Sequence, residues 1–457
     1  RSWRAVKRHM LEELTDVHPV VLFGGVAAAA SVGVFFVQRR RKRASAAQKA
    51  RQQGMSPEEF RAAGHALVDW LVDHRLKASE FPVVSHVEPG YLRKILASEA
   101  PHDGESWGAI LADFSQGIVP GLTHLGSPNC FSQDQATAFP CVLADLFSSG
   151  LGAFGFSVMS PAHVELESVI ADWVAKMLGL QEVFCSDTGG GAVIQHSSFD
   201  AFITAILAAR ARILSEIPPN EHEGVGNLLV AYVSDQSWEL VRGIHERTGL
   251  PLCQFRCVKT VGSNHRLTAS AVQAAIATDL SSGLVPMFLC CSLGSACCGT
   301  LDPIQELAGI AVEQGLWLHV DGSYAAGYGA CPELREPLAV HNYADTYVVG
   351  TNPLLAELDG GEGVLMFYQH AGFVGPASHR LPQPGSWVRA YRLWFGLRAI
   401  GVAGLQNRLR HNVRLATVLE ELVSSSAEFE LVTPRCMGMV SFRLRGRDDL
   451  ETAQLLE

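Results

Sequence analysis

Three features of the sequence carry residues whose types and spacing could do chemistry. Two adjacent cysteine pairs, Cys290–Cys291 and Cys297–Cys298, stand among the 11 cysteines, but neither belongs to a CxxC motif with a second partner pair. This spacing favours buried free thiols in a reducing compartment over a metal site or a disulfide framework. His196 could act as a ligand or a base, although no neighbouring residue completes such a signature. Asp321 ends an apolar run, where its carboxylate could serve a site or cap a neighbouring loop.

Length and composition indicate one large folded domain, or two unequal ones, with a substantial core. The chain has 457 residues, 48% of them hydrophobic and only 18% charged, and its formal net charge is -10. An acidic chain without a long basic run in its globular part is a poor candidate for nucleic-acid binding. The first residue is Arg, so the sequence does not define a targeting peptide.

The N-terminal segment predicts a single transmembrane helix. Residues 20–37 read VVLFGGVAAAASVGVFFV, without a charged side chain. A helix of this length spans roughly 27 Å, close to the thickness of the hydrocarbon core. Residues 1–19 form a basic segment, and RRRKR follows at 39–43, whereas an export signal ends at a small-residue cleavage site. Positively charged segments next to a transmembrane helix tend to stay on the inner side of the membrane, so the cations at 39–43 predict that the large domain lies on that side. We favour the matrix side of the mitochondrial inner membrane.

Small residues recur along one face of this predicted helix. Gly25, Ala29 and Gly33 are spaced four residues apart, which would let a second transmembrane helix approach closely. We therefore expect other membrane-complex subunits as partners on this face, together with membrane lipid and no nucleic acid. The same spacing is common by chance in a span rich in Ala and Gly.

The elements that must position the candidate residues follow a polar linker at 38–55. Ser56, Pro57 and Glu59 form a capping box that predicts a helix running to about residue 74. Further helices are predicted around 164–178, 200–215, 236–248, 269–280 and 303–313. Buried parallel strands are predicted at 228–233, 285–293, 316–321 and 344–349. This alternation predicts an open α/β sheet with its site at the C-terminal ends of the strands.

Seven segments of the chain match the motifs of one enzyme family in the same order. They are VEPGYLR (87–93), GFS to SPAHVELE (155–167), GGGAVIQHSS (189–198), VSDQS (233–237), LWLHVDGSYA (316–325), CPELR (331–335) and RLWFGLR (392–398). Through these segments the chain resembles the group II pyridoxal-phosphate-dependent amino-acid decarboxylases, and the aromatic-L-amino-acid decarboxylases among them. The resemblance implies a fold-type I transferase-like architecture. Its expected parts are an N-terminal helical segment at 56–130 that supports a dimer in relatives, a large domain at 131–385, and a smaller, incomplete C-terminal α+β domain at 386–457.

The resemblance also implies a set of cofactor-binding residues, and it exposes one gap. Asp321 matches the acid that faces the pyridine nitrogen. The Schiff-base lysine is missing, because Pro353 occupies its position after Asn352, and no lysine occurs anywhere after Lys259. Neither Pro nor Asn can form an imine.

Other parts of the expected site are altered as well. The phosphate cradle reads His196-Ser197-Ser198-Phe199, and Trp238 stands where the family stacks a histidine on the ring. We count Asp321, Ser198, Trp238, Ser323 and Asn352 as degenerate remnants of the cofactor site, with Trp238 and Phe199 filling the old pocket. The segment at 125–135, which matches the family's substrate pocket, differs in sequence from that of the relatives. The stretch between Tyr368 and Trp394 is shorter than in the relatives, and Tyr391 is its only tyrosine.

These losses lead to one main functional hypothesis and one alternative. The main hypothesis is a catalytically inactive, membrane-anchored accessory subunit of an organellar complex, with no catalytic residue, no cofactor and no metal. The alternative is a pyridoxal-phosphate-dependent decarboxylase, or another enzyme of altered, lysine-independent chemistry. Intact Asp321 and the HVD segment motivate this alternative. The ancestral homodimer could persist under either hypothesis.

Overall fold

The structure is a computed structural model. It describes residues 54–124, 126–127, 137–151, 161–248, 254–262, 264–295, 298–340, 343–350, 363–369 and 386–446. The chain divides into two compact units, Arg1–Cys130 and Phe131–Glu457. Residues 20–37, with Gly25, Ala29 and Gly33, lie outside the described residues. Within the described ranges, no helix combines the length and the apolar character needed to cross a bilayer.

Helices make up most of the described part of the N-terminal unit. They are α3 (Pro57–Leu76), α4 (Leu92–Ile95) and α5 (Trp107–Asp113), the last followed by a π-helical turn at Phe114–Ile118. The predicted capping box is confirmed at the start of α3. The Glu59 N–H donates to Ser56 Oγ at 3.1 Å, and the Ser56 N–H donates to Glu59 Oε2 at 2.7 Å. Two otherwise orphaned donors of the first turn are thereby satisfied.

A stack of aromatic and histidine rings holds the C-terminal half of α3. His74 stacks on Trp70 with ring centroids 5.0 Å apart, and its ring lies 4.7 Å from Phe81 and 5.4 Å from His124. Phe81 in turn stacks on His124 at 4.8 Å. Burial lowers the pKa of His74, and the charges of His124 and Arg75 lower it further.

Acidification is therefore expected to destabilise the N-terminal unit. Because the folded-state pKa of His74 lies below its unfolded value, the unfolded chain takes up more protons as the pH falls through about 6.5. The stability conferred by neutral His74 is present above that pH and is lost below it. Thermal unfolding of the wild type and of His74→Phe between pH 8 and 5 checks this, because Phe keeps the ring stack without the titration. Equal pH dependence in both proteins would contradict it.

A seven-stranded sheet forms the centre of the C-terminal unit. Its strands are β1 (Gly191–Gln195), β2 (Leu229–Ser234), β3 (Phe255–Val258), β4 (Val285–Ser292), β5 (Trp317–Gly322), β6 (Thr346–Gly350) and β7 (Val364–Tyr368). They lie in the order β1-β7-β6-β5-β4-β2-β3. The pairs from β3 to β6 are all parallel, as predicted for the four apolar runs, whereas β7 runs antiparallel to both β1 and β6.

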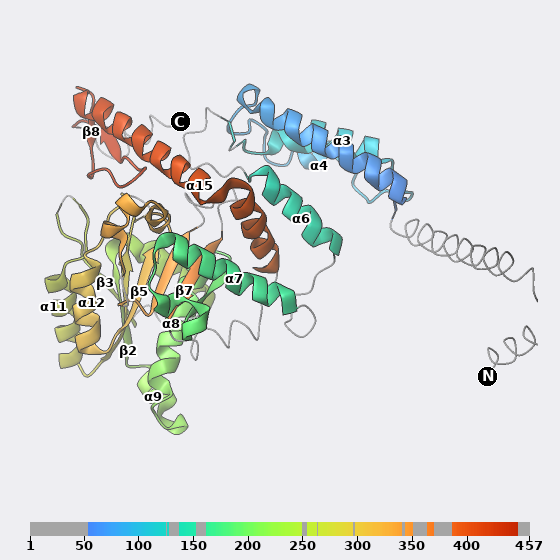
Figure 1. The fold of residues 1–457 in the computed structure, drawn as a ribbon. Coiled ribbons are helices and arrows are strands. Elements are labelled where there is room, and N and C mark those ends of the chain that lie inside the picture. The colour runs from blue at the N-terminus through green and yellow to red at the C-terminus, as the bar shows by residue number, and fades with distance from the viewer. Residues whose placement is uncertain are drawn as a thin grey trace, which may run out of the picture. The chain divides into compact units, whose positions relative to one another are not determined.

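Helices cover both faces of this sheet and give a three-layer α/β fold (Figure 1). One face packs against α8 (Ser198–Leu214) and α10 (Trp238–Thr248), and the other against α7 (Pro161–Leu178), α11 (Ala269–Ser281), α12 (Ile304–Gln314) and the first part of α15 (Ser386–Ser425). Further elements are α6 (Phe139–Leu151), α9 (His222–Gly226) and a two-stranded sheet of β8 (Phe429–Leu431) and β9 (Phe442–Leu444), besides short 3-10 turns. The five helices predicted in this unit are confirmed as α7, α8, α10, α11 and α12.

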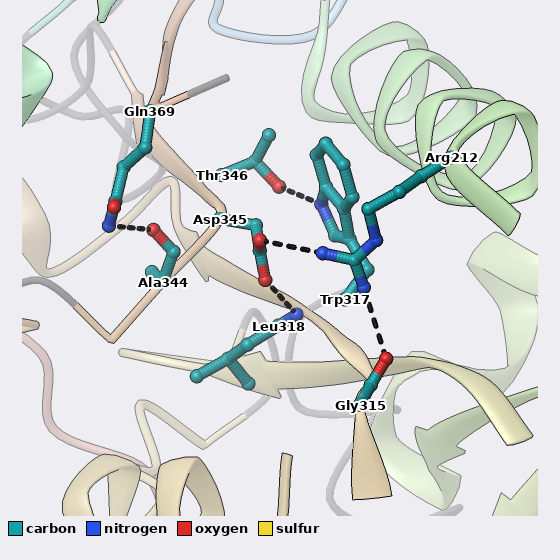
Figure 2. A network of polar contacts seen from close by, with 8 residues as sticks. All are labelled: Arg212, Gly315, Trp317, Leu318, Ala344, Asp345, Thr346 and Gln369. Carbon is teal, nitrogen blue, oxygen red and sulfur yellow. Dashed lines mark hydrogen bonds and ion pairs between the residues drawn. The ribbon is translucent and has the colours of Figure 1, made fainter. Parts of the chain in front are cut away.

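A polar network ties α8 to the N-terminal ends of β5 and β6 (Figure 2). The Arg212 guanidinium donates to Asp345 Oδ1 at 3.0 Å and to the Gly315 carbonyl at 3.1 Å, and it lies 5.0 Å from the centroid of the Trp317 ring. Asp345 Oδ2 accepts from the Leu318 N–H at 2.8 Å. The carboxylate therefore joins the helix to the strand.

Replacing Asp345 by Asn is expected to lower the free energy of unfolding by about 2 kcal/mol, because the mostly buried guanidinium of Arg212 loses its counter-charge. Denaturant unfolding measures the change. Arg443→Gln serves as a matched control, since it removes an ion pair with Glu430 that is much more exposed and is worth less than about 1 kcal/mol. Equal effects of the two substitutions would contradict the role assigned to Asp345.

Candidate active site

The C-terminal ends of the parallel strands bring the chemistry-bearing residues to one edge of the sheet. Asp321 lies at the end of β5, and Ser292 pairs with it from the end of β4. Asp235 follows β2, and Ser198 begins α8 directly after β1. Open α/β sheets place their ligands at this edge.

Ser323 holds the Asp321 carboxylate through one of its two oxygens. Asp321 Oδ1 accepts from the Ser323 N–H at 2.9 Å, and the Ser323 hydroxyl donates to the same oxygen. No hydrogen bond from a described residue reaches Oδ2. The local turn therefore fixes the orientation of the carboxylate and leaves an acceptor for a further donor at the end of the strand.

The backbone of β6 approaches the Ser323 turn closely. A Cβ atom added at Gly350 would lie 1.9 Å from the Ser323 carbonyl oxygen and 2.7 Å from its carbonyl carbon. Only glycine fits there, so the last residue of β6 keeps the turn that orients Asp321 in place.

The first turn of α8 lies beside this edge. Ser197 is its N-cap, and Ser197 Oγ accepts from the Asp200 N–H at 3.2 Å and donates to Asp200 Oδ2 at 2.9 Å. Neither the N–H nor the hydroxyl of Ser198 donates to another described residue. Free donors at a helix N-terminus favour an anionic group such as a phosphate.

A buried histidine lies two residues before Asp321 on β5. His319 is 1% exposed, its Nδ1 lies 2.8 Å from Thr346 Oγ1, and its ring stacks on Phe288. Burial lowers the pKa of His319 to about 4, and the neighbouring Asp321 charge opposes that shift. His319 is therefore neutral at physiological pH.

The structure brings some of the expected site residues together and leaves others undescribed. Asp321 and Ser323 are in direct contact. Trp238 begins α10, but its side chain is outside the described part. Asn352 and Pro353 also lie outside the described residues, as does most of the predicted substrate-pocket segment. Tyr391 lies on α15, with its hydroxyl 2.7 Å from His163 Nε2 on α7.

Two residues that share the strand face of Asp321 were not predicted from the sequence. His319 and Trp317 alternate with Val320 and Leu318 along β5, so they share the face of the strand that carries Asp321. This alternation in the WLHVDG segment was the available signal. The partner Thr346 on β6 could not be identified without the register between the two strands.

A large cavity of the C-terminal unit lies elsewhere. It has a volume of about 960 Å³ and is lined by residues from the ends of α7 and α12, and by residues 298–303 and 433–437. None of Asp321, Ser323 and Ser198 lines it. The candidate active site is therefore defined by the strand ends, not by cavity size.

Comparison with known proteins places the chain in a family. The pyridoxal-dependent decarboxylase conserved domain matches residues 89–357 and 370–445. Tyrosine decarboxylase 4 of Petroselinum crispum is 34% identical over 415 residues, covering 86% of this chain and 80% of the relative. Phenylacetaldehyde synthase of Arabidopsis thaliana is 35% identical over 416 residues, covering 85% and 83%.

A solved structure of another decarboxylase is also similar to this chain. The crystal structure of Catharanthus roseus tryptophan decarboxylase in complex with L-tryptophan has a TM-score of 0.80 and 31% identity, covering 88% of this chain and 89% of that one. The chain therefore belongs to the pyridoxal-dependent decarboxylase family and has its fold-type I architecture.

These comparisons correct the main functional hypothesis. The prediction of a catalytically inactive accessory subunit is wrong, because relatives that match most of the chain are decarboxylases and an aldehyde synthase. The predicted location in the mitochondrial inner membrane is corrected on the same finding, since none of these relatives is named as a membrane subunit. The alternative, an enzyme, fits the findings better.

The prediction of no cofactor is also wrong, because the family is defined by its dependence on pyridoxal. The described residues fit pyridoxal phosphate at two points. Asp321 Oδ2 can accept the proton of the pyridine nitrogen, and the donors of Ser198 at the start of α8 can hold the phosphate.

Proposed function

We propose that this chain is an enzyme that binds pyridoxal phosphate and acts on an aromatic L-amino acid. The observation that carries the proposal is the Asp321 carboxylate at the end of β5, held through Oδ1 and with Oδ2 left available. The names of the relatives, which include tyrosine and tryptophan decarboxylases, support an aromatic substrate. Loss of the substrate carboxylate is the reaction we favour.

Asp321, Ser323 and Ser198 would each have a distinct role in such a site. When bound, pyridoxal phosphate supplies a ring that withdraws electrons from the bond to be broken. Asp321 would keep the proton on the pyridine nitrogen, and Ser323 would hold Asp321 in the orientation for this. Ser198 and the first turn of α8 would bind the phosphate.

The chain would do this without the family's lysine. No lysine follows Lys259, so residues 260–457 offer no lysine side-chain amine for covalent attachment of the cofactor. We therefore propose that the cofactor is held by non-covalent contacts alone. The α-amine of the amino acid then provides the amine that reacts. Without prior attachment of the cofactor, turnover is expected to be slow.

Titration of the purified full chain with pyridoxal phosphate, followed by absorbance, tests this proposal. We expect saturable binding, no attachment of the cofactor to the protein after borohydride reduction, and release of carbon dioxide from tyrosine, tryptophan or phenylalanine. Aldehyde formation is measured in the same assays, because one relative is an aldehyde synthase. Absence of saturable binding would overturn the proposal.

We also propose that two copies of the chain associate, as the resemblance implies for the segment 56–130. Light scattering of the purified chain would show a mass of twice 49.3 kDa. A mass of one chain at micromolar concentration would contradict it.

A further inference from the structure

The cavity that lies apart from the candidate active site contains a buried hydroxyl group. Its volume of about 960 Å³ is within the range of sites that hold small molecules. Tyr347, the second residue of β6, is one of the residues that line it. Whether this cavity is a site depends on what its walls offer to a ligand.

The side chain of Tyr347 is almost completely enclosed. Tyr347 is 2% exposed, and because it lines the cavity, the part that remains exposed faces the cavity. Its ring packs against Gly322, where an added Cβ would lie 2.9 Å from Tyr347 Cε2. No described residue makes a hydrogen bond with its hydroxyl group.

A second buried tyrosine of the sheet shows what the hydroxyl of Tyr347 lacks. Tyr232 on β2 is fully buried, and its hydroxyl donates to Asp279 Oδ2 at 3.0 Å. An enclosed hydroxyl without such a bond is unfavourable for the folded chain. A molecule inside the cavity can provide the acceptor that the described residues do not.

The charges around the cavity favour an uncharged molecule. The charged residues that line it are Arg266, Asp302, Glu306, Arg335, Glu336 and Arg435. Both carboxylate oxygens of Asp302 accept backbone N–H groups, from Leu267 at 2.9 Å and from Ser292 at 2.8 Å. Arg435 is paired with Glu420 at 2.8 Å. The other four are two arginines and two glutamates at exposed or half-buried positions, so they add no net charge.

The surroundings of Tyr347 itself are apolar. Burial alone raises the pKa of its hydroxyl, and no charged group contributes to the shift. The buried apolar residues that line the cavity include Leu178, Ile304, Ala326, Leu338 and Val340. Apolar walls with few polar groups are typical of small-molecule sites.

We propose that this cavity binds an uncharged, largely apolar small molecule whose oxygen atom accepts a hydrogen bond from the Tyr347 hydroxyl. Alcohols, phenols and ketones have this chemistry. The apolar walls hold the body of the ligand, and the single hydroxyl selects for its oxygen. The site is separate from Asp321 and Ser198, so the inference does not rest on the proposed function.

Binding of 2-naphthol to the purified full chain tests the proposal, with naphthalene as the matched compound that lacks the oxygen. Fluorescence titration at neutral pH, at which 2-naphthol is uncharged, measures both affinities. We expect Tyr347→Phe to weaken binding of 2-naphthol about fivefold, as for one hydrogen bond, and to change binding of naphthalene less than about twofold. Equal effects on the two compounds would overturn the proposal. So would the absence of binding of either compound to the wild type, because the cavity would then hold water only.

The stability of the ligand-free chain tests whether the hydroxyl of Tyr347 has a partner within the protein. Tyr232→Phe is the matched control, because it removes a buried hydroxyl that is bonded to Asp279. We expect Tyr232→Phe to lower the equilibrium constant for folding about tenfold, and Tyr347→Phe to leave it within about twofold or to raise it. A tenfold loss in Tyr347→Phe as well would overturn the proposal.

A signal from Tyr347 itself locates the bound probe. In chain labelled with ¹³C at the ζ carbon of tyrosine, the Tyr347 signal is the one that Tyr347→Phe removes. We expect 2-naphthol to shift this signal and to leave that of Tyr232 in place, whereas an unchanged Tyr347 signal at saturation would contradict the inference. All three measurements use chain without added cofactor. Their failure leaves the proposed function standing, and failure of pyridoxal phosphate to bind leaves this inference standing.

Discussion

Replacing Asp321 by Asn is expected to lower turnover of an aromatic amino acid by roughly 10²- to 10³-fold, the loss typical of one electrostatic group at a reaction centre. Binding of pyridoxal phosphate should weaken about tenfold, as for one lost hydrogen bond to a charged group. The amide cannot hold a proton on the pyridine nitrogen, so the ring withdraws electrons less strongly. Steady-state kinetics and a cofactor titration measure the two effects.

The substitution also separates the two roles that the sequence leaves open for Asp321. If the carboxylate only capped the loop, Asn would preserve that role, because its Oδ1 can still accept from the Ser323 N–H and hydroxyl. Unchanged activity in Asp321→Asn would therefore favour the capping role. Asp187→Asn is the control, since Asp187 is exposed in the turn that precedes β1 and is not among the residues of the candidate site.

Gly350→Ala is expected to destabilise the C-terminal unit by at least about 3 kcal/mol, at the upper end for overpacking. The new methyl group would lie 1.9 Å from the Ser323 carbonyl oxygen, and the Ser323 atoms that it meets are backbone, so no side-chain rotation can relieve the clash. Either β6 or the Ser323 turn must move, and Asp321 would move with the turn. Denaturant unfolding gives the loss, and cofactor affinity should fall in the fraction that remains folded.

Gly309→Ala is the matched control for this prediction. Gly309 lies on an exposed face of α12, where an added Cβ meets no atom within 4 Å. Alanine is the better helix former there, so this variant should gain up to about 1 kcal/mol. If both variants lost stability equally, the close approach at Gly350 would not be the cause.

Strong local signals made much of the fold predictable. The Ser56–Glu59 capping box marked the start of α3, and apolar runs of six to nine residues marked β2, β4, β5 and β6. The strand β7, VLMFY, was missed, and β1, GAVIQ, was read only as part of a motif. Five apolar residues fit a buried strand or part of a helix equally well. Their mutual pairing joins segments about 170 residues apart, which periodicity cannot reveal.

The candidate site was predictable where one residue carried the signal. Asp321 was predicted from the resemblance of its HVDGSY segment to the family motif, whereas the bonds of His319 and Ser323 depend on strand register and turn geometry. The main hypothesis, an inactive accessory subunit, was wrong because it was inferred chiefly from the missing lysine. In the family that lysine attaches the cofactor, and without it this chain still has Asp321 and Ser198, the residues we propose for the pyridine nitrogen and the phosphate.

The antiparallel strand β7 has a consequence for the order in which the chain can fold. It lies between β1 and β6 and pairs with both. The strand β1, which leads into α8, therefore cannot join the sheet until residue 368 has been synthesised. The parallel strands β2 to β6 can assemble earlier, from contacts that are closer in sequence. On a ribosome, the end of the site that carries Ser198, which we propose binds the phosphate, would therefore be completed last. Ribosome-bound chains that end before residue 364 should protect the amides of β4 and β5 from exchange, but not those of β1.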